Sequence, residues 1–505
     1  MAYKHQVSIS ESGTSVLSPV EAAAGLPVYF GTAPIHLTDN PSAYVNKPVL
    51  AYSYEEAVKA LGYHSDWNDY TLCEAIKAQF QLFNVAPAVF VNVLDPSIHK
   101  ENVADSAITL SSGKYTIAVD GVLLSTLVVK LTGAGNALVR NKDYTVVFNG
   151  SGHPVISRVD GGDIPANQTS LTVSYDKLTP STVTDAQIIG GIDSGTGKVT
   201  GLELINKIFP LYRLVPGQIV VPKHSKKPAV AAVMKAKSTG INSLFKAMAI
   251  ADIDSSSTGA GVYTEAPAWK NNNNFSDPHL VACYLKAKLG DEIYHLSTQF
   301  AALNSKVIAE NGNVPYVSPS NKNIQANAVV NEADTEINLG VDQAAYLNGE
   351  GIVTAINFVG GWKLWGNNTS VYPANTDVKD RFIPVRQMFN WIGNTLILTH
   401  WQVVDDPTNR RLIDTVVDST NIWLNGLTAQ GSILGGRVEF RAADNPVTSL
   451  LDGKVSYRLF LRLPYRLKTL SSNLNLMWRI FKISLQPNHT RQVDKQWLTK
   501  QFLIA

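Results

Sequence analysis

Two short segments contain residue types that bind phosphate or attack a carbonyl carbon in enzymes. Gly195–Lys198 (GTGK) has the last glycine and the lysine of a phosphate-binding loop, which also needs a glycine five residues earlier and Ser or Thr after the lysine. Ile192 and Val199 occupy those two positions. Ser194 follows an aspartate but lacks the GxSxG turn that presents a serine nucleophile. We interpret both segments as loops.

The other polar residues are not spaced as metal ligands or as an acid–base pair. The ten histidines form no HxH or HExxH motif, and Cys73 and Cys283 have no partner at ligand spacing. The carboxylates of Glu55–Glu56 and of Asp405–Asp406 are adjacent in sequence, so each pair points to different faces. We predict no catalytic residue, no metal and no cofactor, and the absence of a disulfide framework indicates synthesis in a reducing compartment.

Tryptophan gives one more signal for chemistry. Among the nine tryptophans, Trp362 and Trp365 are close enough in sequence to stack together on a sugar. A carbohydrate-active enzyme also needs two carboxylates about 5–10 Å apart in a cleft, and the sequence nominates no such pair. We favour packing in a core or an interface, with a carbohydrate-active enzyme as the weaker alternative.

Length and composition indicate a large structural protein. A chain of 505 residues suits roughly two to four domains. Only 17% of the residues are charged, so much of the surface is neutral and polar, which costs little to pack against another protein, although compositional drift gives the same value. The net charge of +2 favours neither nucleic acid nor an anionic membrane. We expect neither a cleaved export signal nor a membrane span, because no sufficiently long apolar run occurs.

The hydrophobic pattern predicts the elements that would position these residues. Residues 1–20, with Val7, Ile9, Val16 and Leu17 among polar neighbours, are predicted as an extended arm, with a frayed terminus as the alternative. Residues 21–100 combine compact apolar runs with a capped helix at Ser53–Gly62, which indicates the first part of an α/β layer.

The middle of the chain breaks that rhythm. Residues 101–190 contain five alternating segments and a hairpin turn, which predict an inserted β-sandwich or barrel. The α/β pattern resumes over residues 191–335 and 336–464, where Thr395–Val404 is predicted as a strand and Asn409–Gly426 as an amphipathic helix. The predicted fold class is α/β (α+β), multidomain, with a mixed sheet core and an inserted all-β domain.

Short motifs follow one another in a fixed order through residues 312–453. They comprise Pro319, Ser320 and Asn321; Gly351; Trp365, Gly366 and Thr369; Arg386; and Asn445 with Gly453. In this order they resemble the contractile phage tail sheath family, which includes tailocin and R-type pyocin-like sheaths. The resemblance covers residues 20–100 and 200–464, and Asn368 and Gln387 stand where the family usually has arginine.

The resemblance implies a structural, non-enzymatic subunit. Its copies would form hexameric rings stacked helically around an inner tail tube protein, with baseplate and tail terminator proteins as further partners. Contraction would drive the tube through a target envelope. The particle would be a virion tail or a tailocin, assembled in the bacterial host cytoplasm, without a nucleic-acid partner. A capsid or adhesin protein with an immunoglobulin-like module is the structural alternative, which the β-insert suggests.

The resemblance also implies two kinds of contact residue. Arms in this family add strands to the sheets of neighbouring subunits, which suits residues 1–20. A late helix of the family rests on the inner tube, which suits the polar face of the predicted helix after Asn409 with Arg410, Arg411, Asp414 and Asp418. A solvated helix face is the alternative. The β-insert is expected at the periphery, on the outer face of the tube.

The end of the chain, residues 465–505, is an atypical basic tail. From Val455 to Ala505 a single acid, Asp494, stands against nine bases. Permitted codons for Tyr465–Arg479, read from the third base, encode PPKDIEFKLEFDVE, which resembles the C-terminal arm strand that the family has at this point. Our hypothesis is that the tail is read in a shifted frame; a genuine basic tail that binds a partner is the alternative.

Sequencing of the underlying DNA tests the shifted frame. We expect the codons that follow Pro464 to encode the acidic–aliphatic strand in another frame. DNA that cannot encode this strand in either other frame would rule the hypothesis out.

Overall fold

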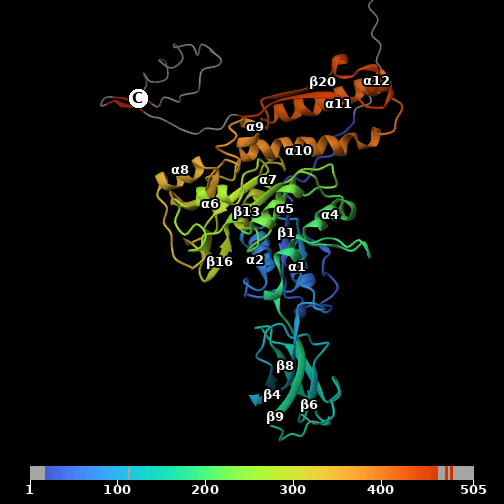
Figure 1. The fold of residues 1–505 in the computed structure, drawn as a ribbon, viewed down its shortest axis with the longest axis vertical. Helices are drawn as coiled ribbons and strands as arrows, with labels where there is room; N and C mark the ends of the chain where they lie inside the picture. The colour runs from blue at the N-terminus through green and yellow to red at the C-terminus, as the bar shows by residue number, and fades with distance from the viewer. Residues whose placement is uncertain (1–16, 112–113, 134, 465–472, 476–477, 481–505) are drawn as a thin grey trace, which may run out of the picture.

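The structure, a computed structural model, describes residues 17–111, 114–133, 135–464, 473–475 and 478–480. Figure 1 shows three tiers along the long axis: a β-domain at one end, an α/β body in the middle, and a layer with two long helices at the other end. The predicted multidomain α/β fold is confirmed. The expectations for Val7, Ile9 and Val16 lie outside the described residues. So does the tail hypothesis, apart from two short paired strands, β22 (Asn473–Asn475) and β23 (Trp478–Ile480).

An eight-stranded mixed sheet forms the core of the body. In spatial order its strands are β19 (Gly361–Trp365), β18 (Ile352–Phe358), β14 (Leu280–Tyr284), β13 (Met248–Ile253), β12 (Gln218–Val220), β1 (Pro27–Gly31), β3 (Ala88–Asn92) and β2 (Pro48–Ala51). The inner six strands are parallel, and the two edge strands, β19 and β2, run antiparallel to their neighbours. Every residue of β1, β3, β12, β13 and β14 is buried, as expected for parallel strands covered on both faces.

Helices cover this sheet. They are α1 (Tyr54–Leu61), α2 (Thr71–Lys77, continued by a π-helical turn over Ala78–Leu82), α3 (Asp185–Ile189), α4 (Ile205–Tyr212), α5 (Pro228–Ser238), α6 (Ala266–Asn272), α7 (Leu296–Glu310) and α8 (Val341–Gly349). The nearly fully buried α7 packs against β1, β12, β13 and β14. The predicted helix at Ser53–Gly62 is confirmed: the Ser53 hydroxyl accepts from the Glu56 N–H (3.2 Å), and Gly62 ends the helix at φ 77°.

Smaller pairings complete the body. β15 (Lys286–Leu289) lies between β16 (Glu292–His295) and β17 (Ala328–Val330) in a three-stranded sheet. β10 (Gly191–Ile192) and β11 (Val199–Thr200) form a short hairpin that contains the GTGK segment, so that segment is a turn, as interpreted from the sequence.

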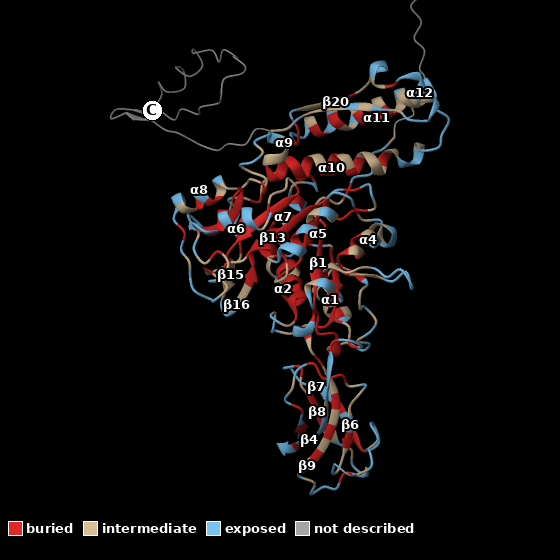
Figure 2. Cartoon of the chain, in the orientation of Figure 1, coloured by how far each residue is buried: buried red, intermediate tan, exposed pale blue. Residues whose placement is uncertain are grey.

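The inserted β-domain has its own sheet and core. Its spatial strand order is β6 (Val128–Lys130), β9 (Ser170–Leu178), β4 (Lys100–Ser111), β5 (Lys114–Thr116), β8 (Pro154–Arg158) and β7 (Tyr144–Phe148). Alternate residues over most of β9 are buried, and Figure 2 shows buried residues of this domain in red. Lys100 pairs with Leu178, and the Thr179 N–H donates to the His99 carbonyl (3.0 Å). The chain therefore enters and leaves this domain through adjacent strands, and α3, which follows, packs against α5 of the body.

The third tier is built from helices and a hairpin. It contains α9 (Val378–Arg381), α10 (Ile383–His400), a 3-10 turn (Trp401–Val403), α11 (Arg410–Ala429), β20 (Gly435–Phe440), α12 (Val447–Leu451) and β21 (Tyr457–Arg462). The hairpin of β20 and β21 packs on α11, and Figure 1 shows α10 between α11 and the body.

The strand predicted over Thr395–Val404 is wrong, because these residues form the end of α10 and the 3-10 turn after it. A short run of threonines and large aliphatic residues fits a buried strand or a buried helix equally well. The helix prevails because Pro384 stands in its first turn and because Trp391 and Thr395, one turn apart, are both buried.

Candidate assembly interface

The structure brings most of the sequence motifs together where the edge of the central sheet meets the helical layer. The Ser320 hydroxyl accepts from the Gly366 N–H (3.1 Å), and the Asn321 N–H donates to the Leu364 carbonyl (2.7 Å). The Pro319 carbonyl accepts from the Lys322 N–H (3.3 Å), which closes the turn that contains Ser320 and Asn321. This loop is thereby held to the end of β19, the strand that carries Trp365.

Two motif glycines allow backbones to touch in this junction. Gly351 has φ 70°, and a Cβ added to it would lie 2.5 Å from the Tyr372 carbonyl oxygen. Gly366 has φ 143°, and its added Cβ would lie 2.8 Å from Asn348 Oδ1. Any other residue at either position would push these segments apart as well as strain the backbone.

Where the backbones are in close contact, buried carbonyl groups require hydrogen-bond donors. The side chain of Lys270 provides these donors. Its ammonium group, on α6, donates to the Glu350 carbonyl and to the Ser370 and Tyr372 carbonyls (both 2.9 Å). The lysine is 1% exposed, and burial lowers its pKa to about 8, whereas the three carbonyl oxygens favour the charged form. Sequence reasoning missed this residue, since a single lysine inside a short helix carries no distinguishing pattern.

Arg386 and Thr369 fasten the start of α10 to the same junction. The Thr369 hydroxyl donates to the Asp380 carbonyl (2.6 Å), and Arg386 Nη1 contacts the Asp380 carboxylate at 3.1 Å. Burial on its own raises the pKa of Asp380, but the hydrogen bonds and charges of Lys379 and Arg386 outweigh burial and lower that pKa. The predicted motif residues therefore have structural contacts here.

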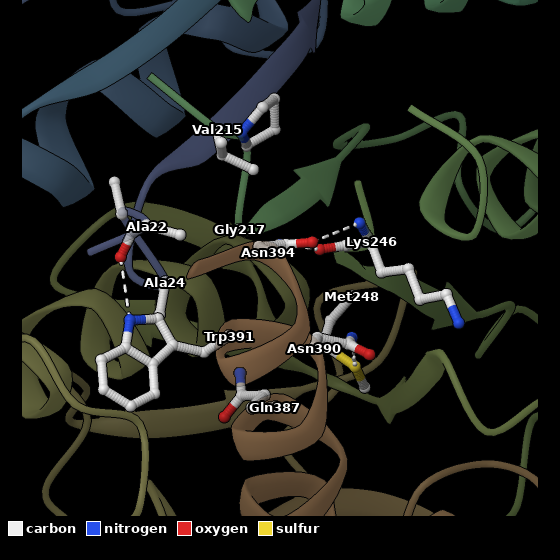
Figure 3. Close-up of a pocket in the computed structure, with 12 residues that line it drawn as sticks. Ala22, Ala24, Val215, Gly217, Lys246, Met248, Gln387, Asn390, Trp391 and Asn394 are labelled. Carbon is white, nitrogen blue, oxygen red and sulfur yellow. Dashed lines mark hydrogen bonds between the residues drawn. The ribbon is translucent and has the colours of Figure 1, made fainter. Parts of the chain in front are cut away.

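Asn368 and Gln387, the two positions that depart from the family pattern, differ in their hydrogen bonding. Asn368 donates to the Asn348 carbonyl (2.8 Å) and accepts from Arg381 Nε (3.1 Å), so a guanidinium still reaches this point from another position. Gln387 is buried, and neither polar atom of its side chain has a hydrogen-bond partner among the described residues. It lines a small cavity beside Ala22–Ala24, shown in Figure 3, with room for about one water molecule.

The last two motif residues shape the hairpin of the third tier. Asn445 is buried; its Oδ1 accepts from the Ser456 N–H (2.6 Å) and its Nδ2 donates to the Ser456 and Arg441 carbonyls (both 2.9 Å). These bonds join the end of β20 to the start of β21. Gly453 ends the intervening segment after α12 at φ 72°, a conformation that suits glycine.

The charged residues predicted to contact an inner tube all lie on the exposed side of α11. Arg410, Arg411, Asp414 and Asp418 are exposed, and Arg410 pairs with Asp414 at 3.7 Å. The opposite side of α11 buries Val416, Leu424 and Leu427 and packs against β20. The Asn409 side chain caps the helix by accepting from the Leu412 N–H (2.9 Å). Contact with a tube stays a prediction.

The arm begins beside α11, the helix on which this hairpin packs. Leu17, the one predicted arm residue that the structure describes, is half-buried, and its N–H donates to the Ser419 hydroxyl of α11 (2.9 Å). Among the described residues β20 and β21 pair as strands only with each other. The outer edge of β20 is partly occupied, because the Asn421 side chain of α11 accepts from the Val438 N–H (2.7 Å) and donates to the Val438 carbonyl (3.1 Å). The edge of β21 that faces away from β20 has no strand partner among these residues. Such an edge is suited to accept a further strand.

The described residues offer little support for other kinds of site. No helix in the described ranges combines the length and the apolar character needed to cross a membrane. Within the same ranges, no group of three or more His, Cys, Asp or Glu side chains is placed to hold a metal ion.

Comparison with known proteins gives consistent similarities. No family model matches the sequence. The chain is 27% identical over 471 residues to the tail sheath protein of Burkholderia phage BcepMu, covering 89% of this chain and 92% of that protein. It is 25% identical over 321 residues to a putative prophage major tail sheath protein of Pseudomonas aeruginosa UCBPP-PA14, covering 63% and 75%. It shares its fold with the contracted helical sheath of the anti-feeding prophage (TM-score 0.55, 13% identity, 94% and 100% of the two chains).

We predict that Lys270→Met destabilises the subunit. The change leaves three buried carbonyls without the ammonium, so the free energy of unfolding in urea should fall by about 2–4 kcal/mol, in line with the loss of buried charge-assisted hydrogen bonds. Lys235→Met is the matched control, because Lys235 donates to the single carbonyl of Asn274 at the surface (2.7 Å).

The difference in the free energy of unfolding between the wild type and Lys270→Met should also depend on pH. The folded-state pKa of about 8 lies below the ordinary 10.5, so the unfolded chain binds more protons between these values. Wild-type stability relative to Lys270→Met should therefore rise with pH across this window, and a constant difference would contradict the prediction.

Proposed function

The chain belongs to the contractile tail sheath family, and we propose that its copies form hexameric rings, stacked helically around an inner tail tube, that contract to drive the tube through a target envelope. The role is structural and not catalytic. The observation that carries the assembly mechanism is that α11 supports both the β20–β21 hairpin and the start of the N-terminal arm, at Leu17.

Strand addition would link the subunits. The edge of β21 that faces away from β20 pairs with no strand among the described residues, and a two-stranded sheet supported by a single helix gains stability when a further strand extends it. Residues 1–16 precede the first described contact of the arm, at Leu17, and are long enough to reach a neighbouring subunit in an extended conformation. Main-chain hydrogen bonds would provide the affinity of such a junction.

The exposed side of α11 would face the inner tube. It carries two positive and two negative charges, and the pair of Arg410 with Asp414 is at the surface, so the contact would be polar and modest. A modest polar contact suits a sheath that must slide off its tube on firing. The β-insert lies at the opposite end of the subunit from α11, as Figure 1 shows, so this orientation directs the insert outward.

Contraction would draw its energy from the lattice. The extended array would be metastable, and better packing in the contracted array, summed over many subunits, would supply the energy without a nucleotide. Baseplate and tail terminator proteins would bound the array at its two ends. Assembly would take place in the cytoplasm of the bacterial host, in a phage tail or a tailocin particle.

Removal of residues 1–20 tests the arm. We expect a folded subunit that forms no long sheaths, because the connecting strand is lost while the core of the body begins with β1. Circular dichroism would report the fold, and negative-stain microscopy would report the polymer, with the full-length chain as the control. Long sheaths from the truncated chain, or an unfolded product, would refute the prediction.

Charge reversal tests the tube contact. Arg410→Glu with Arg411→Glu should reduce the amount of sheath assembled on tubes, with a larger effect at low salt because exposed charges are screened. Lys322→Glu is the matched control, because Lys322 is an exposed cation of the body far from α11 in sequence. Assembly on tubes that is equal for both variants, measured by co-sedimentation, would favour a merely solvated helix face.

A further inference from the structure

The start of the described chain lies across both long helices of the third tier, and its backbone holds it there. Figure 1 shows this segment passing α10 toward α11. The Leu17 N–H donates to the Ser419 hydroxyl (2.9 Å), the Val20 N–H to the Thr399 hydroxyl (3.0 Å) and the Ala22 N–H to the Thr395 hydroxyl (3.1 Å). We call these three hydroxyl-bearing residues the hydroxyl track.

The side chains of the segment contribute little to this contact. Residues 18–21 are exposed, and Val20 is 54% exposed although it is apolar. Thr395, Thr399 and Ser419 are all buried, so their hydroxyls depend on protein partners. Thr395 and Thr399 are four residues apart on α10 and therefore lie on one face of the helix. The track thus binds main-chain groups of the segment, and among its exposed side chains Glu21 accepts a long hydrogen bond from Trp423 Nε1 (3.4 Å).

Pro19 limits the register in which the segment can bind the hydroxyl track. Proline has no N–H to donate, and Pro19 falls between Leu17 and Val20, at a position that makes no bond to the track. A shift of two residues outward would bring Pro19 opposite Ser419, where the bond could not form. At the inner end Trp391 Nε1 donates to the Ala22 carbonyl (3.0 Å), which is visible in Figure 3 and fixes the same register.

We propose that Thr395, Thr399 and Ser419 are positioning residues that set the direction and the register in which the N-terminal arm leaves the subunit. This inference rests on the proposed role of the arm as a connector. Because the three hydroxyls lie on α10 and α11, the arm keeps a fixed orientation relative to the hairpin of its own subunit. The same register fixes how many residues remain to span the gap to a neighbour.

Hydrogen exchange of the isolated full-length subunit tests the track directly. Thr399→Val keeps the shape of the side chain and removes the acceptor, so exchange of the Val20 amide should accelerate roughly five- to tenfold, the effect of losing one typical hydrogen bond. Thr428→Val is the matched control, because its hydroxyl bonds the Leu424 carbonyl within α11 (2.8 Å) and does not contact the arm. An unchanged Val20 rate in Thr399→Val would overturn the proposal.

A second pair of variants tests whether assembly depends on the main-chain group. Val20→Pro removes the N–H that the track binds, whereas Val20→Ser changes the exposed side chain and keeps the N–H. We expect Val20→Pro to shorten the sheaths seen by microscopy and Val20→Ser to leave their length unchanged. Equal lengths for the two variants would overturn the positioning role.

The two proposals fail in different ways. If removal of residues 1–20 leaves long sheaths, the connector function fails, and the positioning role fails with it, whatever the exchange rates show. If that removal abolishes sheaths while Thr399→Val leaves the Val20 amide unchanged, the connector function stands and the track alone is refuted.

Discussion

The ammonium group of Lys270, enclosed by carbonyl oxygens, holds together the junction on which the proposed assembly surfaces depend. Lys270 donates to three carbonyls where the edge of the central sheet meets the helical layer, and an ammonium has three N–H groups to give. With those acceptors satisfied, Gly351 and Gly366 bring backbones into contact without leaving buried polar groups unpaired. The chain then enters α9 and α10 along a defined path, and Arg386 ties the start of α10 to Asp380. The hydroxyl track on α10 and the hairpin on α11 take their positions from this junction.

Neutral polar groups hold the start of the arm and join the strands of the hairpin. Hydroxyls of Thr395, Thr399 and Ser419 hold the arm, and the amide of Asn445 joins the two strands of the hairpin. Such groups exchange protein partners for water at low net cost, whereas a buried ion pair would have to regain its hydration each time it separated. The small share of charged residues in the chain, 17%, is consistent with a surface whose contacts form between copies and rearrange.

The sequence predicted the elements whose pattern is local. Several buried strands of the sheet are continuous apolar runs, and the helix from Ser53 to Gly62 carries both of its boundary signals, so these were predicted, whereas the equally buried β14 was not. The strand predicted at Thr395–Val404 failed because a short apolar run has no period of its own, and burial against the body decided for a helix. Lys270, Arg381 and the hydroxyl track escaped notice because their partners are backbone groups or residues distant in sequence. The role of the motif residues could not be read from the sequence, and the structure shows what they contact: most of them meet in one junction.

The β-insert is joined to the body through two neighbouring strands, with the His99 carbonyl bonded to the Thr179 N–H at its base. The two ends of the body that a grafted domain must join, at His99 and Thr179, are directly hydrogen-bonded to each other. An unrelated domain whose own termini are adjacent can therefore replace the insert without changing the path of the body. The graft would have to do without the contacts of Asp120 with His64 and of Phe148 with His36, which the insert makes with the body. The same site is a natural place for an engineer to display a foreign domain on an assembled particle.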